Sequence, residues 1–305
     1  MRFGIVLPTY PAGATVEGVV QVARAAERLG FVSAWTTDHV VLPPDQAGPY
    51  REIFEPLLTL AYLAAVTERI ALGVSVIVVP QRNGVVLAKE LATLDHLCGG
   101  RLLVGVGAGW NETEFRMLGA GERFHRRGAY LDETLALWHR LWTAPEAGFQ
   151  GRFYDLPPVA FGPLPHRAGG PPIWVGGASP GARRRAGRLG AAWHPVGITA
   201  AAVTEQAGLV REAAEASGRA APEIAPRLPL QFGQGSSGQV SARPQHILRA
   251  EPGQMVERLA EYARAGVAEV VCLFGSPDPA FVVAQMEVLA AQVVPALARM
   301  GAASQ

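Results

Sequence analysis

The stretch IALGVSVIVV at residues 70–79 decides the fold class, because a short apolar run rich in β-branched residues is typical of a buried strand. After a short turn comes GVVLAKELATLDHL at residues 84–97, whose apolar residues recur at helical spacing. A second short apolar run, LLVGV, occupies residues 102–106. Strand, helix and strand in this order are typical of a parallel βα repeat, in which helices cover a buried sheet.

The same alternation continues on both sides of this stretch. Strands are predicted at residues 3–7, 33–37, 70–79, 102–106, 173–175, 192–196, 225–232 and 269–274. Helices are predicted at residues 15–29, 56–67, 84–97, 129–142, 181–189, 200–216, 252–265 and 279–300. Eight βα units match a TIM barrel, an α/β fold of about 250 residues with extra length in its loops. We therefore predict a single (β/α)8 barrel domain over residues 1–305.

An open doubly wound sheet is the main alternative to the barrel. Such sheets bind dinucleotides at a Gly-rich turn that follows the first strand. Here the first strand is followed by Pro8 and Pro11, which have no amide hydrogen to donate to a phosphate. The sequence therefore favours the barrel over the open sheet.

Two segments are longer than ordinary connections and are predicted to be loop insertions. Residues 145–172 are rich in proline, glycine and aromatic residues, and residues 233–251 are rich in glycine, serine and glutamine. Long loops in compact domains are commonly lids or connectors. Because the second segment follows a predicted strand, we expect it at the C-terminal face of the barrel, as a candidate flap.

The composition and net charge of the chain indicate which classes of molecule it binds. The chain has 27 Lys and Arg residues against 26 Asp and Glu residues, and its formal net charge is +1. Without a long basic run, this balance disfavours nucleic acid and anionic membrane surfaces. We therefore predict a small-molecule substrate. Lysine occurs once, at Lys89, which indicates a GC-rich genome rather than a function.

The two cysteines and the N-terminus indicate the compartment. Cys98 and Cys272 lie among apolar residues and form neither a disulfide framework nor a thiolate cluster. The seven histidines lack metal-ligand spacing, so no metal site is predicted. The chain begins with a strand-like run, and no uncharged run of membrane-spanning length follows it. We expect a cytoplasmic protein that is neither secreted nor membrane-spanning.

An ionisable pair, Asp38 and His39, directly follows the second predicted strand. In a barrel the C-terminal strand ends carry the chemistry, and histidine exchanges a proton near neutral pH. His39 is therefore the candidate catalytic residue. In the alternative interpretation, Asp38 caps the following turn and His39 only packs over the end of the barrel.

Three alternate glycines, Gly105, Gly107 and Gly109, end the fourth predicted strand. Without side chains they allow a flat ligand or a neighbouring backbone to approach closely. The alternative is tight packing within the barrel, with Trp110 filling a gap and Asn111 capping a helical turn.

The segment Gly176-Gly177-Ala178-Ser179 connects a predicted strand to a predicted helix. Consecutive backbone amides near a helix N-terminus bind phosphate without a lysine. The same geometry also fits a plain glycine turn, with Ser179 as N-cap and Pro180 as the first helical residue.

Taken in order, these motifs resemble the bacterial luciferase-like flavin and deazaflavin oxidoreductases, nearly from end to end. The resemblance rests on FGIVLP at 3–8, Trp35 with Asp38-His39, Glu55-Pro56, AVTERIALG at 65–73, Leu94-Asp95, GGRL at 99–102, the 105–111 run with Glu112 and Glu114, Arg127-Gly128, Asp132-Glu133, and PIWVGG at 172–177.

The resemblance implies a TIM barrel, commonly dimeric, that holds FMN or coenzyme F420 in the cleft at the strand ends. A non-prolyl cis peptide, frequent on the third strand of the family, maps to Ser75-Val76. The predicted cofactor-binding residues are Asp38, His39, Ser75, Val76, Gly107, Asn111, Gly176, Gly177, Ala178 and Ser179, with the phosphate at the last four. The predicted substrate pocket comprises Pro8, Thr9, Trp110 and His194.

The chain also departs from the family pattern. Members that oxidise sugar phosphates have an acidic residue where this chain has Ala108, and they bind the substrate phosphate through lysines. Because Lys89 is the sole lysine, the sequence disfavours glucose 6-phosphate as substrate. The usual Gly-Asp-Gly-Trp stretch before the sixth strand is replaced by Gly190-Ala191-Ala192-Trp193.

The favoured hypothesis is an F420-dependent oxidoreductase that transfers a hydride between the deazaflavin and a small organic substrate, with His39 as proton donor or acceptor. The alternative is an FMN-dependent monooxygenase that uses O2 and reduced flavin from a separate reductase. A third hypothesis, from another class, is a catalytically idle relative that binds a flavin. A homodimer is expected in each case.

Overall fold

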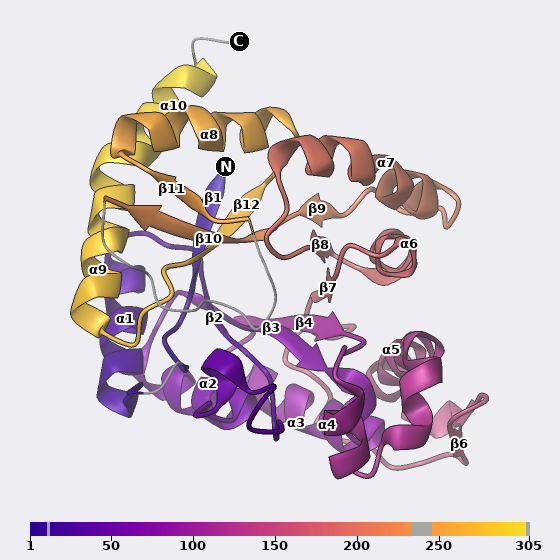
Figure 1. The fold of residues 1–305 in the computed structure, drawn as a ribbon. Helices are drawn as coiled ribbons and strands as arrows, with labels where there is room; N and C mark the ends of the chain where they lie inside the picture. Colours follow the sequence, from indigo (N-terminus) through magenta and orange to yellow (C-terminus); the bar gives the residue numbers. More distant parts are fainter. Residues whose placement is uncertain (11–12, 234–245, 303–305) are drawn as a thin grey trace.

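A closed parallel β-barrel surrounded by helices forms the centre of the molecule (Figure 1). The computed structural model describes residues 1–10, 13–233 and 246–302. The barrel strands are β1 (Arg2–Val6), β2 (Ser33–Thr36), β3 (Ala71–Val78), β4 (Leu102–Gly107), β7 (Ile173–Gly176), β8 (Ala192–His194), β9 (Glu223–Ile224), β10 (Arg227–Phe232) and β12 (Glu269–Leu273). β11 (Leu248–Ala250) pairs with the outer side of β10.

The sheet closes because β9 and β10 act as one strand interrupted at Pro226. β9 pairs with β8, whereas β10 pairs with β12. Around the interruption, the Arg227 amide donates to the Pro195 carbonyl over 2.9 Å, and the Ala268 amide donates to the Ile224 carbonyl over 2.9 Å. These bonds join the two ends of the sheet, so the predicted TIM barrel is confirmed and the open doubly wound sheet is wrong.

The helices cover the outside of the barrel, as the spacing of apolar residues predicts (Figure 1). They are α1 (Val16–Arg28), α2 (Pro56–Val66), α3 (Gly84–Leu97), α4 (Glu112–Met117), α5 (Arg127–Thr143), α6 (Pro180–Leu189), α7 (Ala200–Glu215), α8 (Pro252–Arg264), α9 (Pro279–Val288) and α10 (Val294–Ala302). A π-helical turn at Leu289–Val293 joins α9 to α10. The sequence did not predict the short helix α4.

The segments predicted as loop insertions contain some regular structure. Residues 145–172 include a small hairpin of β5 (Phe149–Gln150) and β6 (Asp155–Leu156). Of the predicted 233–251 insertion, residues 234–245 lie outside the described residues, and β11 near its end was not predicted.

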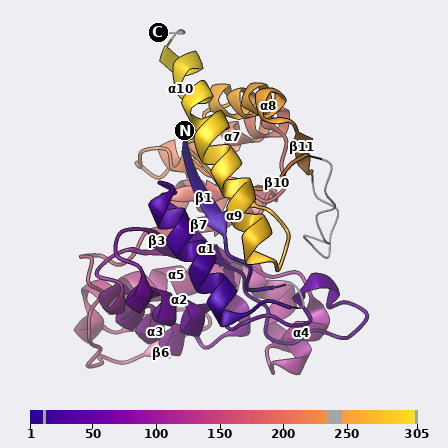
Figure 2. The same cartoon turned by 90° about the vertical axis from the view of Figure 1, so that its left-hand side faces the viewer.

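The C-terminal helical segment Pro279–Met300 is long and apolar enough to span a membrane by composition alone, with a mean hydropathy of 1.7. One such helix is weak evidence for a span, because core helices of globular proteins pass the same test. Here α9 packs beside α1, and α10 packs on α8 (Figure 2). The segment therefore serves as the eighth helix of the barrel.

Large aromatic side chains fill the interior of the barrel. The rings of Trp35 and Trp174 are 4.6 Å apart, and both residues are buried. Trp35 fits because the neighbouring strand offers Gly73, where a Cβ atom would lie 2.5 Å from the indole. Its indole nitrogen donates to Ser33 Oγ over 2.7 Å, so this buried polar atom is satisfied.

The alternate glycines of β4 make room for β3. The peptide between Ser75 and Val76 is cis, as predicted. A Cβ atom on Gly105 would lie 2.0 Å from the Val74 carbonyl oxygen, and one on Gly107 would lie 2.6 Å from the Val76 side chain. At these two positions the structure therefore shows the close approach of a neighbouring strand, the alternative that the sequence left open.

Substitution of Gly105 tests this packing. We expect Gly105→Ala to lower the free energy of unfolding by about 3 kcal/mol or more, because its Cβ would meet backbone, which has little freedom to move. The matched control is Gly208→Ala in α7, where no atom lies within 4 Å of the new Cβ. This control should be unchanged or more stable by up to about 1 kcal/mol. Equal urea midpoints for the two variants would contradict the assignment.

Candidate active site

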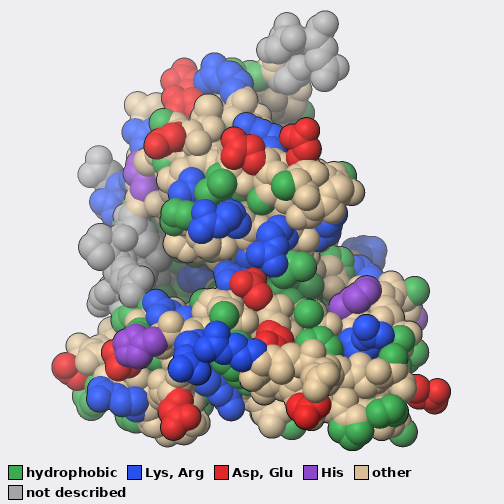
Figure 3. Space-filling view, turned by 90° about the vertical axis from the view of Figure 1, so that its right-hand side faces the viewer, with side chains coloured by type: hydrophobic (Ala, Val, Ile, Leu, Met, Phe, Trp, Pro, Cys, Tyr) green, Lys and Arg blue, Asp and Glu red, His purple; other side chains and the backbone are tan. Residues whose placement is uncertain are grey.

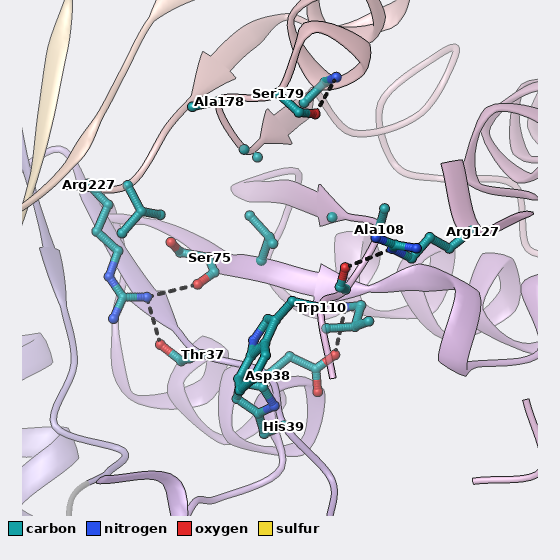
Figure 4. A pocket seen from close by; sticks show the side chains of 18 of the residues that line it. Thr37, Asp38, His39, Ser75, Ala108, Trp110, Arg127, Ala178, Ser179 and Arg227 are labelled. Carbon is teal, nitrogen blue, oxygen red and sulfur yellow. Dashed lines mark hydrogen bonds between the residues drawn. The ribbon is translucent and has the colours of Figure 1, made fainter. Parts of the chain in front are cut away.

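A cavity of about 580 Å³ opens where the barrel strands end (Figure 4). It is lined by Thr37, Asp38, His39, Tyr50, Ser75, Val76, Val78, Gly107, Ala108, Gly109, Trp110, Arg127, Gly176, Gly177, Ala178, Ser179, Ala182, Arg185, Val196 and Arg227. Most of the predicted cofactor and substrate residues lie in this lining. The exceptions are Asn111, Pro8, Thr9 and His194, which are buried behind it.

Asp38 is held by an ion pair. Its carboxylate accepts bonds from Arg82 Nη2 over 2.7 Å and from the Val78 amide over 2.9 Å. Arg82 also reaches Glu55 Oε1 at 3.1 Å. Asp38 therefore ties the end of β2 to the end of β3, and its negative charge is already compensated.

His39 is oriented by a buried glutamate that the sequence interpretation did not single out as a site residue. His39 Nδ1 lies 3.1 Å from Glu114 Oε2, and the Val40 amide donates to Glu114 Oε1 over 2.9 Å. Burial raises the pKa of Glu114, but the interaction with His39 and the bond from the Val40 amide outweigh it and leave the pKa below its usual value. An ionised carboxylate only accepts, so Nδ1 carries the hydrogen and Nε2 is left for a ligand.

Asn111 acts on the site through Glu114 rather than by lining the cavity. Its Oδ1 accepts from the Glu114 amide over 3.1 Å and so caps α4. Its side-chain nitrogen donates to Gln46 Oε1 over 2.9 Å. Asn111 therefore caps a helix, which is the alternative that the sequence left open. A contact between Asn111 and a cofactor stays a prediction.

His194 lies beneath the cavity floor and is fully buried. Burial lowers its pKa to about 4, so the ring is neutral near pH 7. Nδ1 donates to the Ala225 carbonyl, which leaves Nε2 to accept from Ser75 Oγ over 2.7 Å. His194 can therefore influence a ligand through Ser75, but it does not line the predicted substrate pocket.

Pro8 and Thr9 are buried and lie outside the lining of the cavity. The Thr9 carbonyl accepts from the Phe54 amide over 3.2 Å, which fixes the chain after β1. Neither residue lines the cavity, because the chain that follows β1 is covered by the loop before α2. A substrate contact at these two residues is therefore not supported by their position, and it stays an untested prediction.

The opposite end of the cavity is formed by the N-terminus of α6 and two arginines. Ser179 Oγ accepts from the Ala182 amide over 3.2 Å, and Pro180 is the first helical residue, so the predicted N-cap is present. Arg185 is paired with Asp132 over 2.6 Å. Arg127 donates to the carbonyls of Gly109 and Phe124, and its guanidinium lies over the Phe124 ring.

The cavity is therefore cationic although the chain is nearly neutral. Within the described residues, the charges of Asp38 and Arg185 are compensated by ion pairs, whereas Arg127 and Arg227 contact only neutral groups. Figure 3 shows Lys and Arg side chains in and around a hollow on the side of the molecule that carries α5 and α6. An anionic ligand fits this field.

The described residues hold no group of three or more His, Cys, Asp or Glu side chains placed to bind a metal ion. The titratable groups near the cavity instead form pairs, such as His39 with Glu114 and Asp38 with Arg82. The arrangement therefore suits proton transfer beside an anionic organic ligand.

Comparison with known proteins identifies relatives. A family model described as luciferase-like monooxygenase matches residues 1–237. An F420-dependent glucose-6-phosphate dehydrogenase of Nocardia farcinica is 35% identical over 178 residues, which cover 56% of this chain and 51% of the relative. The chain spans only 51% to 64% of the length of the curated relatives with which it was compared.

Two solved structures share the fold over nearly their whole length. An F420-dependent secondary alcohol dehydrogenase in complex with an F420–acetone adduct has a TM-score of 0.82 at 17% identity, covering 97% of this chain and 98% of that one. The oxygenating constituent of 3,6-diketocamphane monooxygenase from Pseudomonas putida, in complex with FMN, has a TM-score of 0.79 at 17% identity, covering 97% and 98%. At such identity the likeness establishes the fold alone.

The pairing of His39 with Glu114 predicts a pH-dependent contribution to stability. We expect Glu114→Gln to lower the free energy of unfolding at pH 7 by about 1–3 kcal/mol, because charged hydrogen bonds to a buried carboxylate are lost. The folded pKa of Glu114 lies below its usual 4.5. The contribution is therefore complete above pH 4.5 and is lost as the pH falls through the folded pKa.

Urea unfolding of wild type and variant, from neutral pH down into the acid range, measures this difference. The matched control is Glu112→Gln, an exposed glutamate in the same helix, which should change stability by no more than about 0.5 kcal/mol. If the two variants had the same free energy of unfolding at pH 7, the buried pair of His39 and Glu114 would make no contribution to stability.

Proposed function

This chain belongs to the luciferase-like monooxygenase family, and we propose that it is an F420-dependent oxidoreductase that transfers a hydride between the deazaflavin and a small organic substrate. The observation that carries the proposal is the oriented His39–Glu114 pair, which faces a cavity with a cationic far end. An F420-dependent relative at 35% identity supports the choice of cofactor.

The residues of the cavity fit such a cofactor. A deazaflavin or flavin nucleotide is a flat ring with an anionic phosphate tail, and phosphate binds at helix N-termini and beside arginine. The turn before α6 and the uncompensated Arg127 supply both features at the same end. Gly107, Gly176 and Val76 would then lie along the ring, whose position is part of the proposal.

Bound F420 would supply the ring carbon that accepts or returns the hydride. The residues of the chain handle the proton. When an alcohol carbon loses a hydride, its hydroxyl proton must leave, and His39 Nε2 is the group placed to accept it. Glu114 stabilises the charged imidazole that results, and Tyr50, whose ring lies 4.6 Å from that of His39, limits its rotation. In the reverse direction His39 donates the same proton.

The lining of the cavity supports a substrate other than glucose 6-phosphate, which is named for the relatives. Ala108 lies in the cavity wall where the resemblance places an acidic residue in sugar-phosphate-oxidising members. Lys89 is exposed on α3 and contacts the carbonyl of Gly162, so it does not line this cavity. We propose a small ketone, imine, alcohol or activated alkene as the reacting group.

An FMN-dependent monooxygenase on the same barrel is the second candidate. It is favoured by the fold likeness to a monooxygenase in complex with FMN. In that case a separate reductase would supply reduced flavin, and O2 would be the second substrate. A homodimer in the cytoplasm is part of both proposals.

The cofactor is tested by parallel calorimetric titration of the purified protein with F420 and FMN, each oxidised and reduced. We expect F420 to bind more tightly than FMN, because hydride transfer requires the deazaflavin to occupy the cavity. Oxygen uptake in the presence of reduced FMN would favour the second candidate. If neither cofactor bound, the proposal would be wrong.

The role of His39 is tested by His39→Asn. We expect turnover to fall by about 10²- to 10⁴-fold, while the affinity for the cofactor changes by less than about threefold, because the variant loses proton transfer but keeps the shape of the cavity. His125→Asn, at an exposed histidine outside the cavity, is the matched control. Tight cofactor binding without turnover in the wild type would indicate the catalytically idle relative.

A further inference from the structure

Arg227, the first residue of β10, is a buried cation with no acidic partner among the described residues. Its side chain is 3% exposed. Nη1 donates to Thr37 Oγ1 over 3.2 Å and to the Ser75 carbonyl over 3.0 Å, and Nη2 donates to the hydroxyl of Tyr10. Nε is buried and has no acceptor within residues 1–10, 13–233 and 246–302. All three partners are neutral groups, so the positive charge is not compensated.

A buried guanidinium in this state is costly, since charges inside proteins are normally paired and fully hydrogen-bonded. Three other arginines have carboxylate partners or a larger set of acceptors, whereas Arg183, on α6, also has a buried Nε without a partner among the described residues. Arg82 and Arg185 pair with carboxylates, and Arg101 directs its nitrogens to five acceptors, namely the carbonyls of Cys98, Ile70, Ala64 and Thr67 and the hydroxyl of Thr67. Unlike those three arginines, Arg227 leaves a buried nitrogen without an acceptor in the part of the chain that the structure describes. Its hydrogen-bonding capacity is therefore incompletely used by the described residues.

Arg227 also lies where a ligand reaches it. It lines the cavity together with its partners Thr37 and Ser75, on the side away from Arg127 (Figure 4). Among the other groups near it, His194 is neutral, and Asp38 is neutralised by Arg82. Among the residues that the structure describes, no carboxylate of the cavity wall is left to balance the charge of Arg227.

His39 lies close to this cation. Thr37, which Arg227 contacts, precedes His39 by two residues, so their Cα atoms are at most about 7 Å apart. A small molecule can therefore span from the guanidinium to the imidazole. Both side chains line the same cavity, as a ligand that contacts the two groups at once requires.

We propose that Arg227 binds a planar, singly charged oxyanion next to His39. The inference rests on the proposed function and names the substrate class of that site. The same chemistry has two sources, the carboxylate of a small organic acid substrate or the anionic pyrimidine edge of the cofactor ring. A planar anion suits an arginine, since guanidinium presents parallel N–H donors.

The test measures three ligands on wild type and on Arg227→Gln. Pyruvate represents a carboxylate substrate, and pyruvamide is its uncharged isostere. FMN in its reduced form, whose ring is an anion near neutral pH, represents the cofactor ring. We expect wild type to bind pyruvate and to bind pyruvamide at least about tenfold more weakly. Arg227→Gln should weaken the affinity for pyruvate or for FMN by at least about 30-fold, as expected for loss of a buried charge pair.

The pattern distinguishes the two sources. Loss of pyruvate affinity alone assigns the oxyanion to the substrate, and loss of FMN affinity alone assigns it to the ring. Because the phosphate end of the cavity is the same in both proteins, the FMN ratio reports the ring end. Unchanged affinity for both ligands overturns the proposal.

Three further variants separate a specific effect of Arg227 from general loss of charge or of folding. Arg69→Gln removes an arginine that is 71% exposed and should leave both affinities unchanged. Arg227→Lys keeps the charge and, should Arg227→Gln fail to fold, carries the test. We expect it to retain more affinity than Arg227→Gln but less than wild type, since lysine lacks the planar donor pair. Wild-type affinity in a folded Arg227→Ala would overturn the proposal as well.

Failure of this inference and failure of the proposed function give different results. Binding of F420 by wild type, with no effect of Arg227→Gln on any ligand, leaves the proposed function intact and removes the inference. If pyruvate bound more tightly than pyruvamide through Arg227 but neither F420 nor FMN bound, the inference would stand and the proposed function would be wrong. Both readouts are equilibrium affinities and do not depend on turnover.

Discussion

The site depends on one packing constraint, the close approach of β3 to its neighbours at Val76. A Cβ atom on Gly107 or Gly176 would lie 2.6 Å or 2.9 Å from the side chain of Val76, so only glycine fits at these positions. The absence of side chains there lets the register of β3 shift between Val74 and Ile77. Because of this shift, Ser75 presents its carbonyl to Arg227 and its hydroxyl to His194. The shape of the cavity floor thus follows from the absence of side chains at Gly107 in β4 and Gly176 in β7.

Some polar groups around this floor already have charged or hydrogen-bonding partners in the protein, and the others remain available to a ligand. Asp38 forms an ion pair with Arg82, and Nδ1 of His39 is hydrogen-bonded to Glu114. What remains is the Nε2 atom of His39, the uncompensated charge of Arg227 and, at the far end, Arg127. Fixed dipoles and charges that need no rearrangement are what transition-state stabilisation requires.

The barrel could be predicted from the sequence because its signals are local. Each strand is a short apolar run followed by a periodic helix, and the family motifs place His39, Trp110 and the 176–179 turn at strand ends. The direction in which a side chain at a strand end points depends on packing with residues far away in the sequence. For this reason the sequence placed His194 and Thr9 in the substrate pocket, whereas in the structure they do not line the cavity. Glu114 and Arg227 were missed because their partners are 75 and 190 residues away, and arginine is too common in this chain to be a signal.

The filling of the barrel by Trp35 and Trp174 has a kinetic consequence. Both indoles are buried inside the barrel beside His194: Trp35 stacks on the imidazole at 5.3 Å, and Trp174 meets it edge-on at 5.5 Å. The described part of the barrel axis is therefore occupied by protein. A cofactor and a substrate that both use the cavity must then pass through the same mouth. The molecule seated deeper has to arrive first and depart last, which imposes an ordered sequence of association and release on any two-ligand reaction carried out in this barrel.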